Sequence, residues 1–90
     1  MMVQLMIIKL KDEINRALDF NKSATDLFNK INQKNESDFT MDFDGVIFIS
    51  MSFAQAYYAS KKKSNKNISE INLSDYVKPM MELVEKQLMH

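Results

Sequence analysis

The segment from Met41 to Phe53 constrains the fold of this chain more than any other part of the sequence. An apolar strand pattern ends in Asp44-Gly45, a second short apolar run follows, and Ser52 then opens a helical pattern. A strand, a turn and a helix in close succession are typical of α/β proteins. Helix N-termini present unpaired N–H groups and a positive dipole end, so the helix start at Ser52 suits anions or phosphorylated side chains.

Length and composition favour one compact, helix-rich domain. At 90 residues the chain has room for a single hydrophobic core, so we expect one domain over residues 1–90. The apolar fraction of 46% is typical of a globular protein. The single glycine and single proline argue against a turn-dense β-sandwich.

Charge and cysteine content exclude several function classes. Twelve basic and twelve acidic residues cancel, so there is no global electrostatic drive toward nucleic acid or an acidic membrane. The chain has no cysteine, which excludes disulfides, thiolate zinc sites and thiol nucleophiles. Met1 to Leu10 is apolar but too short to span a bilayer, and it lacks the features of a secretory signal. The expected location is cytoplasmic.

The first half of the chain contains one strand pattern and one helix pattern. A β-branched apolar run that includes Val3, Leu5 and Ile7 predicts a first strand. Residues 12–21 fit either a helix or a hairpin leading to a second strand. From Ser23 the sequence resembles a capping box. A helical apolar face follows at Ala24, Leu27, Phe28 and Ile31.

The second half alternates between strand and helix patterns. Phe39 to Phe43 alternates in polarity and predicts a central strand, and Asp44-Gly45 predicts a turn. The helix opened by Ser52 is short and ends in Lys61, Lys62 and Lys63, since cations in a last turn complement the helix dipole. Ile68 to Leu73 predicts a further strand. The last helix should begin near Pro79, because proline lacks the N–H needed deeper in a helix. Its apolar face comprises Val77, Met80, Met81, Val84 and Leu88.

These patterns together predict an α/β fold, with a small mixed sheet covered by about three helices. Strands that alternate with helices favour βαβ units with right-handed crossovers. We expect one core to contain Phe28, Ile31, Phe43, Tyr57, Met81 and Val84.

The segment Met41 to Phe53 resembles the core motif of STAS domains, named for sulfate transporters and anti-sigma-factor antagonists. It is more similar to a prokaryotic STAS-like group of uncharacterised domains, whose motif reads roughly Asp-Phe-x-Gly-Val-x-x-Ile-Ser-x-Ser-Phe-Ala. The matching positions are Asp42-Phe43, Gly45-Val46, Ile49-Ser50 and Ser52-Phe53-Ala54. The chain follows the family's order of elements from Asp19 to Leu88. Ser50 stands where the antagonists have Asp, and Phe53 where they have Gly.

The resemblance implies a non-catalytic regulatory module that binds a regulatory ATPase or a histidine-kinase-like protein. The expected partner-binding or phosphorylation residues are Ser50, Met51, Ser52, Phe53 and Gln55. The alternative is a nucleotide- or anion-binding sensor that uses the helix N-terminus at Ser52. We expect no enzyme activity, no cofactor and no metal site. Pairing of two copies through the first strand stays open, because an exposed apolar edge strand invites pairing.

Simpler interpretations compete at several of these residues. Ser52 can be a plain N-cap, worth roughly 1 kcal/mol of helix stability. Asp42 and Asp44 can form a carboxylate pair for Mg²⁺ or acid–base chemistry, but a strand end followed by a turn is the favoured interpretation. The run Lys61 to Lys66 beside two tyrosines imitates an RNA-binding patch, although a solvated helix end is the better account. His90 is expected to be a frayed terminus.

Overall fold

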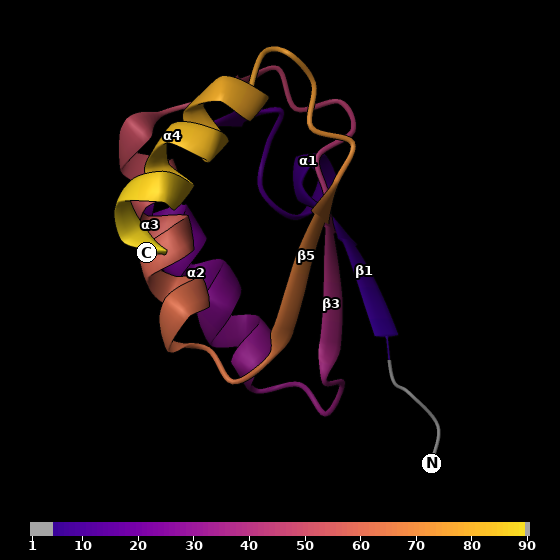
Figure 1. Ribbon diagram of the computed structural model, residues 1–90. Coiled ribbons are helices and arrows are strands. Elements are labelled where there is room, and N and C mark those ends of the chain that lie inside the picture. Colours follow the sequence, from indigo (N-terminus) through magenta and orange to yellow (C-terminus); the bar gives the residue numbers. More distant parts are fainter. Residues whose placement is uncertain (1–4, 90) are drawn as a thin grey trace.

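The computed structural model describes residues 5–89, and it confirms the predicted α/β class (Figure 1). The elements in chain order are β1 (Leu5–Lys9), α1 (Leu10–Glu13), β2 (Ala17–Leu18), α2 (Asn21–Asn32), β3 (Asp38–Asp42), β4 (Phe48–Ile49), α3 (Met51–Lys63), β5 (Asn67–Ile71) and α4 (Lys78–Leu88). No helix in this range is long and apolar enough to cross a membrane.

The strands form two small sheets in which every described pairing is parallel. The larger sheet has the order β1-β3-β5, and a typical row across it is Ile7, Thr40 and Ser69. The strand predicted over Phe39 to Phe43 is therefore central, as expected. The smaller sheet pairs β2 with β4. Two parallel sheets thus replace the single mixed sheet that we expected.

The region left open between helix and hairpin contains the short helix α1 and the strand β2. β2 pairs with β4 rather than with β1, so it is not the second strand of a hairpin. The capping box predicted at Ser23 is wrong, because α2 begins at Asn21 with Phe20 at the N-cap and no side-chain cap. β2 ends at Leu18, where its pairing with β4 ends, and α2 begins three residues later at Asn21. The tertiary contact between β2 and β4 thus outweighs the capping pattern at Ser23.

Val3, part of the predicted first strand, lies outside the described residues.

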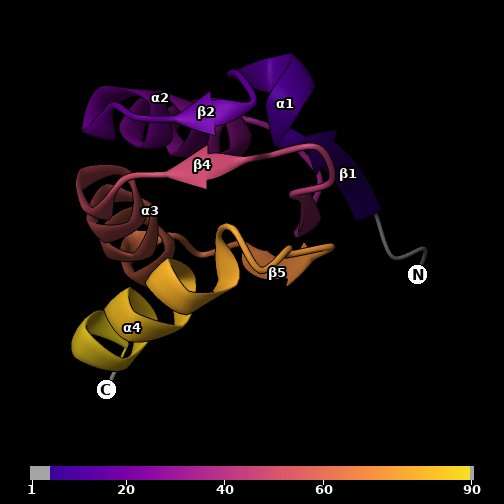
Figure 2. The ribbon, with the colours of Figure 1, turned by 90° about the horizontal axis from the view of Figure 1, so that it is seen from above.

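Three helices lie on one side of the larger sheet. Figures 1 and 2 show α2, α3 and α4 together on that side, and Figure 2 shows β2 and β4 side by side near the starts of α2 and α3. The opposite face of the larger sheet has no covering element among the described residues, and Leu5 and Ile7 are each 58% exposed there. The predicted start of the last helix is confirmed, with Pro79 in the first turn of α4.

Tyr57 of α3 lies at the centre of the core. Its ring makes edge contacts with Phe28 and Tyr58, each at a centroid distance of 5.2 Å, and lies near Phe43 and Phe53. All six residues predicted to share one core are buried, together with the apolar face predicted for α2. The core prediction is therefore confirmed.

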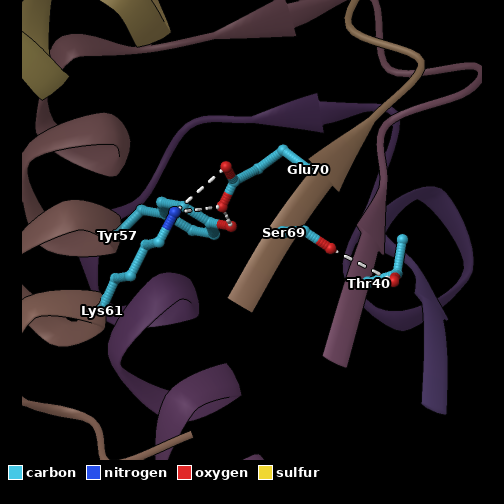
Figure 3. A network of polar contacts seen from close by, with 5 residues as sticks. All are labelled: Thr40, Tyr57, Lys61, Ser69 and Glu70. Carbon is cyan, nitrogen blue, oxygen red and sulfur yellow. Dashed lines mark hydrogen bonds and ion pairs between the residues drawn. The ribbon is translucent and has the colours of Figure 1, made fainter. Parts of the chain in front are cut away.

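A buried polar contact joins α3 to β5 (Figure 3). The Tyr57 hydroxyl donates to Glu70 Oε2 at 2.6 Å, and Lys61 Nζ lies 2.9 Å from the same oxygen. The Lys61 and Glu70 side chains are only 17% and 13% exposed. Burial, followed by the charge and hydrogen bond of Glu70, raises the pKa of Tyr57 well above its ordinary value. Tyr57 therefore stays protonated while the protein is folded.

We expect Phe28→Ala to lower the free energy of unfolding by about 3–5 kcal/mol, the usual cost of deleting a buried aromatic ring. Phe20→Ala is the matched control, because Phe20 is exposed and an exposed substitution usually changes stability by about 0.5 kcal/mol or less. Urea denaturation followed by circular dichroism measures both variants. Equal stability of the two variants would contradict the core described above.

Stability should fall as the pH rises above about 10. In that range tyrosine in the unfolded chain loses its proton, whereas Tyr57 in the folded chain keeps it, so the folded state binds more protons and alkali favours unfolding. Tyr57→Phe should make the fall between pH 9.5 and 11 shallower in chemical denaturation. The same slope in both proteins would show that Tyr57 titrates normally.

Candidate functional site

Ser50 caps α3, whereas we predicted that Ser52 opens the helix. The Ser50 hydroxyl accepts a hydrogen bond from the Phe53 N–H at 3.0 Å and donates one to the Asp19 carbonyl at 2.6 Å. α3 begins at Met51, so Ser52 is the second residue of the helix. The plain N-cap interpretation of Ser52 is therefore wrong, and the capping role belongs to Ser50.

Backbone hydrogen bonds hold the starts of α2 and α3 side by side. The Ile47 N–H donates to the Arg16 carbonyl and the Ser50 N–H donates to the Leu18 carbonyl, both at 2.9 Å. Together with the β2–β4 pairing, these bonds place residues 16–20 beside residues 47–51. Asp19 and Phe20 are thus neighbours of Ser50 and Met51 in space, although about 30 positions separate them in the sequence.

The helix divides the five predicted site residues between surface and core. Met51, Ser52 and Gln55 are exposed, and Ser50 is half-buried. Phe53 is fully buried, with its ring 6.3 Å from that of Tyr57, so its assignment to a contact surface is wrong. The helical period explains this division, because Phe53 and Tyr57 are four residues apart and share the inward face.

Three exposed apolar residues lie beside these positions and were not among the site residues predicted from the sequence. Phe20 is 72% exposed, Ile47 is 57% exposed and Phe48 is 46% exposed. Single exposed apolar residues are common, but several on adjoining segments mark a contact surface. We refer to six exposed residues at the starts of α2 and α3 as the helix-start surface: Phe20, Ile47, Phe48, Met51, Ser52 and Gln55.

A negative charge is electrostatically favourable at the start of α3. Its first turn contains no acidic residue, and helix N-termini favour anions. A phosphate on Ser52 would therefore be tolerated by the helix itself. Because Ser52 is exposed, a modifying enzyme can reach it without unfolding the domain.

Asp42 ends β3 and Asp44 lies in the turn that follows, as the simpler interpretation predicted. Asp42 Oδ1 accepts hydrogen bonds from Asn72 Nδ2 at 3.0 Å and from the Asp44 N–H at 2.9 Å. The Asn72 bond and then the Asp44 bond lower the pKa of Asp42. Gly45 completes the turn with a φ of +82°. Within residues 5–89, no cluster of three or more acidic or histidine side chains is arranged to hold a metal ion.

The lysine run does not form an RNA-binding patch with the tyrosines. Tyr57 and Tyr58 are buried, so neither ring can stack on a base. Lys61 is paired with Glu70 rather than solvated, and Lys66 Nζ donates to the carbonyls of Lys34 and Glu36. His90 lies outside the described residues.

Four hollows of the described chain lie away from the helix-start surface. They have volumes of about 260–420 Å³, and none is lined by residues 50–55.

Removing the cap should destabilise the protein measurably. We expect Ser50→Ala to cost about 0.5–2 kcal/mol, because the Phe53 N–H and the Asp19 carbonyl both lose a partner. Ser52→Ala, which removes a hydroxyl of similar chemistry two residues away, should cost about 0.5 kcal/mol or less. Thermal denaturation compares the two variants. A larger loss for Ser52→Ala would overturn the assignment of the cap.

The chain was compared with protein families, with curated proteins and with solved structures. No family, no curated protein and no solved structure matches it.

Proposed function

We propose that this chain is a non-catalytic, STAS-like regulatory module that binds a protein partner through the helix-start surface. The observation that carries the proposal is the exposure of Phe20, Phe48 and Met51 on two chain segments that the β2–β4 pairing and the Ser50 hydrogen bonds hold side by side. Ser52 and Gln55 add polar groups to the same surface. Aromatic residues and methionine surrounded by polar groups are characteristic of protein interfaces.

The construction of the surface supports a binding role. The helix-start surface comes from two chain segments, residues 16–20 and residues 47–55. Hydrogen bonds from Ile47 and Ser50 to the first segment fix the two segments relative to each other. The inward side of α3 is anchored in the core by Phe53 and Tyr57. A rigid surface loses little conformational entropy when a partner binds, which favours affinity.

The motif resemblance supports a regulatory ATPase or a histidine-kinase-like protein as the partner. Ser52 then supplies a means of control. A phosphate adds a charge of about −1.5 to −2, which is costly to bury in an apolar contact. We therefore propose that phosphorylation of Ser52 releases the partner while the domain stays folded.

Capture of partners from the native host tests the surface. The bait proteins are the wild type, Met51→Glu and Leu83→Glu; Met51 and Leu83 are 45% and 47% exposed, and both lie on helices. We expect the wild type and Leu83→Glu to retain an ATPase or histidine-kinase-like protein, and Met51→Glu to retain at least tenfold less. Equal recovery with all three baits, or recovery of no such protein, would contradict the proposal.

Calorimetry with the purified partner tests the switch. Ser52→Asp should weaken binding at least tenfold, while Ser52→Ala should change it less than threefold. An acidic residue in the first turn of a helix is favourable, so Ser52→Asp should melt no lower than the wild type. If the two variants bind equally well, Ser52 is not a switch.

A further inference from the structure

The larger sheet has an unpaired apolar edge at β1. Among the described residues, the backbone of residues 5–8 makes no hydrogen bond except those of the β1–β3 ladder. Leu5 and Ile7 are each 58% exposed and alternate with the less exposed Met6 and Ile8, so they lie on the face of the sheet that has no helix. Parallel sheets are normally covered on both faces, and natural proteins normally protect a free edge. The β1 edge therefore requires a physical explanation.

The other edge of the same sheet, at β5, is more polar than β1. On β5, Asn67 Nδ2 donates to Asp38, and Ser69 shares a hydrogen bond with Thr40 across the open face (Figure 3). Glu70 is occupied by Tyr57 and Lys61 on the helix side. Pairing at β1 is thus favoured over pairing at β5.

A hollow follows the free edge of β1. It has a volume of about 420 Å³ and is lined by Met6 to Lys9 together with Asp12, Glu13 and Lys34. A second hollow of about 260 Å³ shares Ile8, Glu13 and Lys34 with it and extends along α2 past Leu27 and Ile31. This space lies where the inward side chains of an added strand would go.

We propose that β1 pairs antiparallel with β1 of a second copy of this chain, about a two-fold axis at Ile7. This register pairs the whole of the five-residue strand with itself. Leu5 then lies opposite Lys9 of the other copy, Met6 opposite Ile8, and Ile7 opposite Ile7. Because paired residues point to the same face, the two sheets join into one continuous sheet with all helices on one side.

The charges along the edge are complementary to their own two-fold copy. Asp12 and Lys34 lie toward opposite ends of β1. Asp12 is in α1, just after the carboxyl end of β1. Lys34 lies shortly before Asp38, the residue that pairs with Leu5 at the amino end of β1. Both residues line the hollow, and neither makes an ion pair within residues 5–89. An antiparallel arrangement brings Asp12 of each copy toward Lys34 of the other. A closed two-fold contact requires this kind of self-complementarity.

The absence of cysteine allows the register to be tested by single-cysteine variants. Residues directly opposite in an antiparallel pair have Cβ atoms about 4.5–5.5 Å apart, close to the spacing of a disulfide. Ile7→Cys should therefore form an interchain disulfide in mild oxidant. Leu5→Cys is the matched control, equally exposed but about 13 Å along the strand from its symmetry mate. We expect at least tenfold more cross-linking for Ile7→Cys, and equal or reversed yields would overturn the register.

Sedimentation equilibrium tests the assembly without a cross-link. We expect the wild type to approach the mass of two 10.5 kDa chains at about 100 μM, with the dissociation constant raised at least tenfold by Ile7→Lys. Ser69→Lys, in the same row of the sheet but on β5, should leave that constant within threefold.

Charge reversal tests the predicted ion pairs. Asp12→Lys and Lys34→Asp should each raise the dissociation constant of the dimer, and the double variant should recover at least half of that loss on a logarithmic scale. A monomer at every concentration, or a dimer disrupted by Ser69→Lys and not by Ile7→Lys, would overturn the proposal.

Discussion

The packing of Tyr57 determines the arrangement of the rest of the domain. Its ring packs against aromatic residues of α2 and α3 and against Phe43, which follows β3, while its hydroxyl donates a hydrogen bond to Glu70 of β5. A buried hydroxyl without a partner costs roughly 1–3 kcal/mol, so Glu70 and Tyr57 must be positioned together. This contact fixes the inward side of α3, and Met51, Ser52 and Gln55 are then left exposed on its outward side.

The Ser50 hydroxyl connects the core to the proposed binding surface. One hydrogen bond stabilises the start of α3 and the other holds the chain just before α2. The two helix starts therefore form one surface, and the residues that would bind a partner come from both. Binding at this surface and pairing at the β1 edge use separate residues, so a dimer would carry two helix-start surfaces.

The sequence predicts the elements whose signals are local. Alternation from Phe39 to Phe43 and the apolar faces of α2, α3 and α4 gave the central strand, the three long helices and the core. β2 was not predicted, because a two-residue strand has no periodicity and exists only through its pairing with β4. The cap was assigned to the wrong serine, since both serines have capping chemistry and only the distant Asp19 carbonyl distinguishes them. The exposure of Phe20 and Phe48 could not be predicted for the same reason: it depends on the non-local β2–β4 contact.

Amide chemical-shift perturbation of the ¹⁵N-labelled chain would show which residues contact a protein partner. The captured ATPase or histidine-kinase-like protein would be titrated into the labelled chain. The labelled chain would be kept below the concentration at which two copies of it pair. If the helix-start surface binds the partner, the largest changes fall on Phe20, residues 47–52 and Gln55, and β1 and α4 are nearly unaffected. Changes centred on β1, or on the outer side of α4 around Leu83, would contradict it.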